Sequence, residues 1–295
     1  RAMTLADNVK RWGLGNVVVT NNDPSHFEGL HDWFDMVLVD APCSGEGMFR
    51  KNPEARQQWS NANVQLCASR QRRILADIWQ SLKPGGILVY STCTFNRQEN
   101  EDNVEWLASE YDAEVVEIDT DPAWGVVKGA TKEGINTFRF YPHMAMGEGF
   151  FAAVVRKGAR KSRVKTPKPR RTVLTDLPGK SLPPVKKWVA QSEYMQFATV
   201  GDNIYSYYRA AYPGVKMLSE CLSVVYSGVL TGQLFGNKLR PEHPLALFHD
   251  LAGDAAPQAG LPLDEALEYL RKHDVDPMLF QEGINLAAFE GLPIG

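Results

Sequence analysis

Three residues that could carry out chemistry follow two apolar segments of this 295-residue sequence. Asp40 and Cys43 belong to the run DAPCSGEG at residues 40–47, and Cys93 directly follows the apolar segment 87–92. A cysteine thiolate is a nucleophile that forms covalent intermediates, and a carboxylate nearby can move a proton or bind a cation. Free cysteine is more often a buried hydrophobic residue, which is what we expect of Cys67 and Cys221. The Gly, Pro and Asp residues around Cys43 and Cys93 favour the reactive alternative.

The segments around these residues predict an α/β domain. Helical patterns alternate with apolar segments that are rich in β-branched residues. One helical pattern covers residues 54–82, and another begins near Asn96, with Glu99 in the capping-box position three residues later. Such alternation is typical of a mostly parallel sheet covered on both faces. Ligands of such sheets lie at the carboxyl ends of the strands, so Asp40, Cys43 and Cys93 meet there if their strands are neighbours. The predicted strands are 16–20, 36–40, 87–92, 115–118 and 149–155.

Composition places the chain among ordinary globular proteins. Hydrophobic residues make up 44% and charged residues 23%, and the length predicts two domains. Four cysteines without a CxxC pair argue against a disulfide framework, and the spacing of the six histidines does not suggest a metal site. No stretch approaches the ~20 apolar residues of a membrane span, so we expect a reducing, cytoplasmic setting without membrane or metal.

A strongly basic segment separates the two predicted domains. Nine of the sixteen residues 156–171 are Lys or Arg and none is acidic, although the whole chain has a formal charge of −3. Together with several prolines this predicts a linker over 158–187. Such a segment is usually solvated, yet in a chain that is otherwise acidic it also offers a local positive surface to a polyanion. The candidate phosphate-binding residues are Arg50, Lys51, Arg160, Lys161 and Arg163.

Residues 188–295 predict a smaller module with mixed secondary structure. Aromatic and β-branched residues mark strands at 203–208, 222–226 and 284–289, and a helical pattern covers 263–271. We interpret this module as α+β or barrel-like. The predicted domains are thus residues 1–157, the linker 158–187 and the module 188–295.

Two motifs about fifty residues apart give the chemistry a more specific interpretation. VLVDAPCSGEG at 37–47 and YSTCT at 90–94, followed by QENE at 98–101, resemble motifs IV and VI of the RNA (cytosine-5)-methyltransferases. RFYPH at 139–143 and GEGFF at 147–151 resemble that family's last conserved strand region. The continuation MFRKNPE at 48–54 most resembles the bacterial branch that acts on 16S ribosomal RNA. Residues 188–295 resemble that branch's PUA-like RNA-binding region more weakly, through GVLTG at 228–232 and PEHPLAL at 241–247.

This resemblance implies a fold, a reaction and roles for individual residues. The fold is a Rossmann-like class I methyltransferase sheet followed by a smaller α+β PUA-like domain. The reaction is the S-adenosylmethionine-dependent methylation of carbon 5 of cytidine in ribosomal RNA or the small ribosomal subunit, through a covalent cysteine adduct. Cys93 is then the nucleophile, Cys43 helps to resolve the adduct, and Asp23 and Asp40 bind the cofactor. From the residues alone, Asp23 could equally be a turn residue before Pro24.

The family's Gly-rich cofactor motif is absent from this sequence. The chain opens at Arg1-Ala2-Met3, in what resembles the helix after the second strand, so we expect the amino-terminal strands of the sheet to be missing. Two alternatives therefore stay open beside an active ribosomal RNA enzyme. The chain could be a non-catalytic RNA-binding remnant, or it could belong to a transfer-RNA cytosine-5 methyltransferase.

Overall fold

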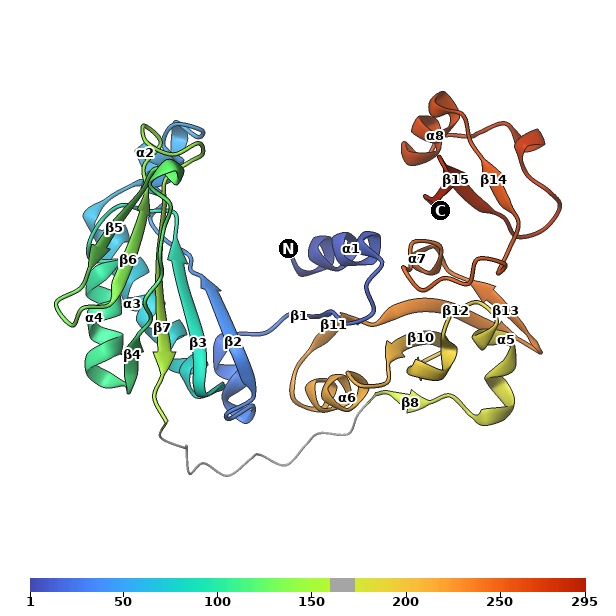
Figure 1. Cartoon of the computed structure of the whole chain (residues 1–295), viewed down its shortest axis with the longest axis horizontal. Coiled ribbons are helices and arrows are strands. Elements are labelled where there is room, and N and C mark those ends of the chain that lie inside the picture. Colours follow the sequence, from blue (N-terminus) through green and yellow to red (C-terminus); the bar gives the residue numbers. More distant parts are fainter. Residues whose placement is uncertain (160–172) are drawn as a thin grey trace. The chain divides into compact units, whose positions relative to one another are not determined.

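The computed structural model describes residues 1–159 and 173–295 (Figure 1). Within these residues the chain forms two compact units. Residues 23–159 form one of them, which contains Cys43 and Cys93 and is called the cysteine unit below. Residues 1–22 and 173–295 form the other, called the carboxyl-terminal unit. Each unit buries its own clusters of apolar side chains.

A six-stranded sheet forms the centre of the cysteine unit, in the order β2-β3-β7-β6-β5 with β4 also pairing with β7. The strands are β2 (Phe34–Asp40), β3 (Leu82–Thr92), β4 (Ala113–Val115), β5 (Val126–Ala130), β6 (Asn136–Phe140) and β7 (Phe150–Lys157). The structure confirms the predicted strands 36–40, 87–92 and 149–155 as β2, β3 and β7. The predicted strand 115–118 lies two to three residues earlier, as β4.

The expectation of a mostly parallel sheet is wrong for these strands. β2 and β3 are parallel, but the pairs β3–β7, β4–β7, β5–β6 and β6–β7 are all antiparallel. A parallel pair needs a long crossover, usually a helix, whereas short turns join antiparallel strands. Helices connect β2 to β3, but β5, β6 and β7 follow one another through loops, and β5 and β6 were not predicted.

Three helices belong to this unit: α2 (Glu54–Gln58), α3 (Asn61–Trp79) and α4 (Glu101–Glu110). The single helix predicted over 54–82 is therefore two helices. The backbone of Trp59 is extended, and Ser60 then caps α3 by accepting a hydrogen bond from the Asn63 N–H at 3.1 Å. α3 and α4 supply Leu75, Trp79 and Leu107 to the core that covers one face of the sheet (Figure 1).

The other face of β2 is not covered as predicted. Met36 and Leu38 are 62% and 66% exposed, whereas Val39, which faces α3, is buried. Successive side chains of a strand point to opposite faces of the sheet, so a continuous apolar sequence indicates that both faces of the strand are hydrophobic. It does not indicate whether a helix packs on each face.

The carboxyl-terminal unit contains three sheets. The largest has the order β13-β12-β10-β9-β8, and two smaller ones are β1-β11 and β14-β15-β16. The strands are β1 (Val18–Thr20), β8 (Thr175–Asp176), β9 (Met195–Val200), β10 (Asn203–Tyr208), β11 (Val224–Ser227), β12 (Val229–Phe235), β13 (Lys238–Pro241), β14 (Gln258–Gly260), β15 (Leu286–Phe289) and β16 (Leu292–Pro293). The helices are α1 (Ala2–Trp12), α5 (Pro183–Lys186), α6 (Tyr212–Cys221), α7 (His243–Ala246) and α8 (Leu263–Leu270). The predicted strands 203–208, 222–226 and 284–289 and the helix 263–271 correspond to β10, β11, β15 and α8.

The predicted strand 16–20 joins a different sheet from the one expected. It forms β1, which pairs antiparallel with β11 in the carboxyl-terminal unit. Val19 packs there with Ala6 and Val9 of α1 and with Tyr226 of β11. An apolar strand pattern does not specify the partner strand, and this contact spans more than two hundred residues of sequence.

The last part of the predicted linker is also folded. β8 pairs with β9, and Leu177 and Val185 are buried in a core of the carboxyl-terminal unit. Pro183 and Pro184 lie at the start of α5, where a missing N–H costs no helical hydrogen bond, so these prolines begin a helix. Residues 160–172 of the linker lie outside the described residues.

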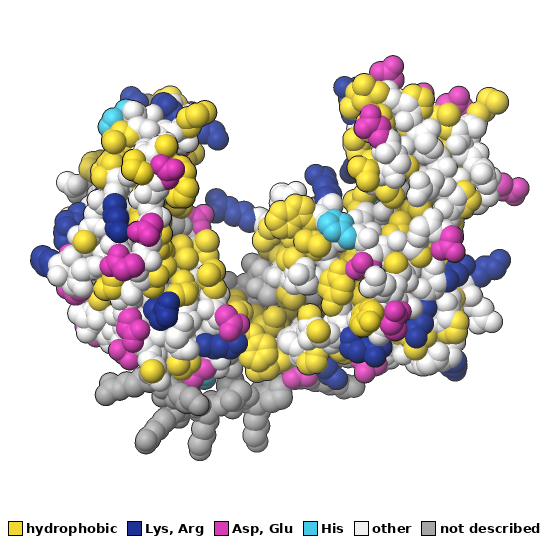
Figure 2. All heavy atoms as spheres, in the orientation of Figure 1, with side chains coloured by type: hydrophobic (Ala, Val, Ile, Leu, Met, Phe, Trp, Pro, Cys, Tyr) yellow, Lys and Arg dark blue, Asp and Glu magenta, His cyan; other side chains and the backbone are white. Residues whose placement is uncertain are grey.

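Acidic and basic side chains intermingle on the visible face of the cysteine unit, and basic side chains stand at its α2 end (Figure 2). In the two described ranges, no helix is long and apolar enough to cross a membrane. The same residues contain no group of three or more His, Cys, Asp or Glu that could hold a metal ion.

Candidate active site

The two cysteines predicted to be reactive, Cys43 and Cys93, lie on loops that leave the sheet at the same edge. β2 and β3 are adjacent and parallel, and Asp40 at the end of β2 pairs with Ser91 near the end of β3. The loops that follow place Cys43 Sγ and Cys93 Sγ 3.1 Å apart. The structure therefore brings together the two thiols that the strand ends predicted as neighbours. Both side chains are partly buried, and neither is part of a disulfide.

Backbone contacts fix these two loops against each other. The Gly47 N–H donates to the Cys93 carbonyl at 2.8 Å, and the Ala41 N–H donates to the Ser91 carbonyl at 2.9 Å. A Cβ atom at Gly47 would lie 2.4 Å from the Gly149 carbonyl oxygen and 2.8 Å from the Cys93 carbonyl oxygen. Glycine is therefore required at residue 47, because any side chain would separate the loops that hold the two sulfurs.

A buried carboxyl group supports the loop that carries Cys43. Glu99 is fully buried and accepts hydrogen bonds from the Ser44 N–H at 3.0 Å, from Gln71 Nε2 at 2.8 Å and from Asn96 Nδ2 at 2.7 Å. Asn103 Nδ2 in turn donates to Gln71 Oε1 at 2.8 Å. Because Ser44 directly follows Cys43, this network holds the Cys43 backbone in place.

Glu99 and Asn96 were predicted to begin a helix, and the structure gives them a different role. The helix α4 begins at Glu101, and Asn100 precedes it. The Asn96 side chain still accepts from the Glu99 N–H at 2.9 Å, so the capping-box contact forms in the turn before the helix. Sequence reasoning missed Gln71 and Asn103, although a polar residue on the apolar face of a helix, such as Gln71, is a usable signal.

A second set of contacts supports the loop that carries Cys93. Thr92 Oγ1 donates to Asn100 Oδ1 at 2.6 Å, and Asn100 Nδ2 donates to the Thr94 carbonyl at 3.0 Å. Arg139 pairs with Glu101 at 2.6 Å and donates to the Phe95 carbonyl at 2.8 Å. The motif residue Arg139 of β6 thus stabilises the loop that carries Cys93.

The sulfur pair makes the two thiols unequal. A hydrogen bond from Cys43 lowers the pKa of the Cys93 thiol to about 7, against the opposing effects of burial and of the nearby Asp40 charge. The same hydrogen bond, with burial, raises the pKa of the Cys43 thiol far above its usual value. When the pair loses one proton, which happens around pH 7, Cys93 therefore carries the negative charge and Cys43 keeps the shared proton. Since the thiolate is the reactive form, Cys93 is the better nucleophile of the two.

The structure places the two predicted cofactor carboxylates in different surroundings. Asp40 is exposed at the end of β2, and the Ser91 hydroxyl lies 3.4 Å from its carboxylate. Asp23 accepts from the Ser25 N–H at 3.1 Å and pairs with both terminal nitrogens of Arg73, at 2.9 and 3.2 Å. The Arg73 guanidinium holds the pKa of Asp23 well below its usual range. Asp23 is thus the turn residue that its sequence suggests and a partner of α3 as well.

The predicted RNA-binding residues divide into two groups. Arg50 and Lys51 are exposed after the Cys43 loop, and Arg50 donates to the Gly147 carbonyl at 2.9 Å and to Glu148 at 3.1 Å. Arg160, Lys161 and Arg163 lie outside the described residues.

Comparison with curated proteins gives relatives named ribosomal RNA small subunit methyltransferase F. Ribosomal RNA small subunit methyltransferase F of Pectobacterium atrosepticum is 40% identical over 159 residues, which are 53% of this chain and 32% of the relative. The protein of the same name from Klebsiella pneumoniae is 31% identical in a match that covers 100% of this chain and 62% of the relative. The chain thus spans about a third of the first relative's length and less than two thirds of the second's.

Among solved structures, NSun6 from Pyrococcus horikoshii, crystallised with SFG, is 28% identical to this chain. The match covers 53% of this chain and 38% of that protein, with a TM-score of 0.44. The family model described as 16S rRNA methyltransferase RsmB/F matches residues 1–156, which include both cysteine loops and the strands that carry them. Because this match covers 156 of the 295 residues, the chain belongs to the 16S rRNA methyltransferase RsmB/F family.

Proposed function

We propose that the chain acts in the S-adenosylmethionine-dependent methylation of carbon 5 of cytidine in small-subunit ribosomal RNA. One observation carries the proposal: the two sulfurs lie 3.1 Å apart at the carboxyl ends of neighbouring parallel strands, with the pKa of one thiol lowered to about 7. Family membership supports methylation of ribosomal RNA and the class I methyltransferase fold of the cysteine unit.

Carbon 5 of cytosine is a weak nucleophile, so the reaction requires covalent activation of the ring. In our proposal the Cys93 thiolate bonds to carbon 6, and the electron pair of the 5,6 double bond moves into the ring and activates carbon 5. S-adenosylmethionine, when bound, would supply an electrophilic methyl group for carbon 5, with the electron pair of the broken sulfur–methyl bond leaving on the neutral thioether. Loss of the proton from carbon 5 then restores the double bond, the carbon–sulfur bond breaks, and Cys93 leaves as a thiolate.

Cys43 can serve the second half of this sequence. Its pKa is raised mainly by the hydrogen bond to the Cys93 sulfur. Once Cys93 Sγ is bonded to carbon, it no longer carries a charge, so the pKa of Cys43 falls. Cys43 can then release its proton and become a base for the carbon 5 proton, directly or through water. This order of events gives Cys43 the role in product release that the family resemblance implied.

Asp40, at the end of β2 and three residues before Cys43, suits a cationic cofactor. The exposed Asp40 carboxylate can accept hydrogen bonds from an ammonium group or from the target base. Asp23 keeps lone pairs beyond those used by Ser25 and Arg73, so we propose it as the partner of the adenosine part. The charge of the Asp40 carboxylate favours binding of a positively charged sulfonium compound, whereas the charge of Asp23 is already paired with Arg73.

RNA binding involves both units in this proposal. Arg50 and Lys51 would contact phosphates near the target base, and Arg160, Lys161 and Arg163 would contact phosphates further away. We propose that the module 188–295 is PUA-like and binds RNA. The substrate is naked ribosomal RNA or the small ribosomal subunit, which implies a cytoplasmic location.

Small-subunit ribosomal RNA transcribed with 5-fluorocytidine tests the proposal, because fluorine at carbon 5 cannot leave as a proton and the adduct persists. With S-adenosylmethionine present, we expect a protein–RNA complex that resists denaturation and disappears in Cys93→Ala. RNA binding without such a complex would support the non-catalytic alternative. A complex that forms on transfer RNA in preference to ribosomal RNA would support the transfer-RNA alternative.

A further inference from the structure

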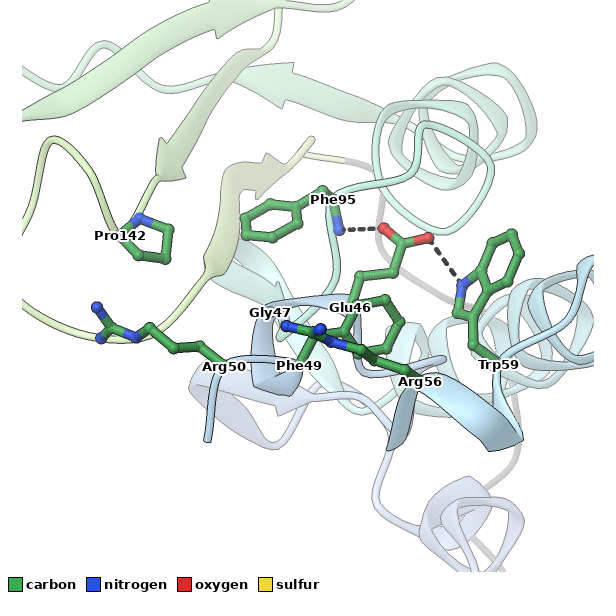
Figure 3. A pocket seen from close by; sticks show the side chains of 8 residues that line it. All are labelled: Glu46, Gly47, Phe49, Arg50, Arg56, Trp59, Phe95 and Pro142. Atoms are coloured by element: carbon green, nitrogen blue, oxygen red, sulfur yellow. Dashed lines mark hydrogen bonds between the residues drawn. The ribbon is translucent and has the colours of Figure 1, made fainter. Parts of the chain in front are cut away.

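A pocket of about 500 Å³ is lined by residues that follow Cys43 and Cys93 in the sequence, together with residues 56, 59 and 142 (Figure 3). Its walls are mostly aromatic or basic, including Phe49, Trp59 and Phe95 together with Arg50 and Arg56. Neither catalytic cysteine lines the pocket, so it is distinct from the place where a base meets the thiols. Its volume falls within the range of about 300–1,000 Å³ that is typical of small-ligand sites.

The aromatic walls of this pocket are held in fixed positions. Phe95 stacks on Tyr141 with ring centroids 5.5 Å apart. A Cβ atom at Gly149 would lie 2.0 Å from the Phe95 ring, so the glycine makes room for that ring. The Trp59 indole N–H donates to Glu46 Oε1 at 2.9 Å. Rigid aromatic rings bind flat ligands at a low cost in conformational entropy, which is how proteins stack unpaired nucleic-acid bases.

Arg56, together with Arg50, which also pairs with Glu148 at 3.1 Å, supplies the positive charge of this pocket. Glu46 also lines it, but Glu46 Oε2 already accepts from the Phe95 N–H at 2.9 Å and Glu46 Oε1 from Trp59, as Figure 3 shows. Arg50 and Arg56 are both exposed, and basic side chains mark this α2 end of the unit in Figure 2. Aromatic rings with guanidinium groups beside them suit a base and its phosphate.

The pocket shares its wall with the nucleophile loop. Phe95 lies two residues after Cys93, and Glu46 lies three residues after Cys43. The Gly47 N–H, in the pocket lining, donates to the Cys93 carbonyl. We propose that this pocket holds an unstacked nucleotide of the RNA substrate, a near neighbour in sequence of the cytidine that reaches Cys93. This inference rests on the proposed function and adds a second nucleotide site to it.

Crosslinking tests which residues touch a base. Small-subunit ribosomal RNA transcribed with 5-bromouridine is irradiated with the protein, and the crosslinked peptides are identified by mass spectrometry. We expect crosslinks at Phe49, Trp59 or Phe95, with fewer in Phe49→Ala and an unchanged yield in Trp124→Ala, which removes an exposed aromatic ring outside the pocket lining. Crosslinks confined to other parts of the chain would overturn the proposal.

Filter binding at several salt concentrations separates stacking from phosphate contact. We expect Phe49→Ala to weaken RNA binding about 5- to 100-fold with an unchanged salt dependence, since stacking carries no charge. Arg56→Gln should reduce the slope of log affinity against log salt by about one. The matched control Lys132→Gln removes an exposed charge outside the pocket lining and should leave the slope unchanged. Wild-type affinity and slope in both pocket variants would overturn the proposal.

These readouts do not require methylation, so the two proposals can fail separately. If wild-type protein forms the 5-fluorocytidine complex but the pocket variants bind RNA normally, the pocket proposal fails alone. If crosslinks map to the pocket but no covalent complex forms, the covalent mechanism fails and the pocket remains a nucleotide site.

Discussion

Replacing Cys43 with alanine removes the hydrogen-bond donor that makes Cys93 acidic. The remaining influences on Cys93, chiefly burial and the Asp40 charge, raise its pKa, so the variant should titrate at or above the ordinary thiol value of 9.0 instead of about 7. At pH 7 the thiolate fraction of Cys93 then falls from about one half to about 1%, roughly a 50-fold loss. Thiolates of higher pKa are more nucleophilic, with a Brønsted coefficient of about 0.4–0.5, which recovers about eight-fold. The net result is an alkylation rate about six-fold slower at pH 7.

The assay is alkylation of Cys93 by iodoacetamide across pH 5–10, followed by mass spectrometry of its peptide. In wild type the rate should rise through an inflection near pH 7 and level off above it, because the thiolate forms as pH passes the pKa. In Cys43→Ala the inflection should move up by about two pH units. Cys43→Ser retains an O–H donor and should keep an inflection below that of the alanine variant. Buried Cys67, measured in the same samples, should react equally in all three proteins. An inflection that is the same in wild type and Cys43→Ala would refute this account of the sulfur pair.

Three further substitutions test what supports the site. Gly47→Ala should abolish the 5-fluorocytidine complex and lower the melting temperature, because its Cβ meets the Gly149 carbonyl oxygen at 2.4 Å; normal activity would contradict the close packing of the loops. Glu99→Gln should lower the free energy of unfolding by about 1–3 kcal/mol in a denaturant titration. In either orientation the new amide directs its NH₂ group at side-chain or backbone donors that hydrogen-bond to a carboxylate oxygen in the wild type, so two donors face each other. Lys157→Met should cost about 2–3 kcal/mol in the same titration, because the buried ammonium donates to the Leu82 carbonyl at 2.6 Å and pairs with Asp32 at 3.2 Å. Unchanged unfolding midpoints would show that these buried contacts contribute little.

The meeting of Cys43 and Cys93 was predictable because it follows from a regular rule. Neighbouring parallel strands end at the same edge of a sheet, so residues just after two such strands come together. The apolar segments identified β2 and β3, and the register of Asp40 with Ser91 places their loops side by side. The strand pattern could not predict which of the two thiols is more acidic, because that depends on a contact between individual sulfur atoms; only the family resemblance gave the two cysteines different roles.

Contacts between residues far apart in the chain could not be predicted. Glu99 binds Ser44, 55 residues away, and the Gln71 side chain, 28 residues away, and local patterns do not encode such pairs. The same reason explains β1, whose partner β11 belongs to the same unit but lies more than two hundred residues later in the sequence. The prolines at 183 and 184 were interpreted as linker residues although they begin α5, because proline is common both in linkers and in the first turn of helices.

The most direct test of the central claim is to identify the atom that bonds to the RNA. The complex formed with 5-fluorocytidine RNA can be digested with nuclease and protease, and the modified peptide sequenced by mass spectrometry. The account predicts a pyrimidine on the sulfur of Cys93 in wild type, and the same site with slower formation in Cys43→Ala. A pyrimidine on Cys43, or adduct formation that persists in Cys93→Ala, would contradict it.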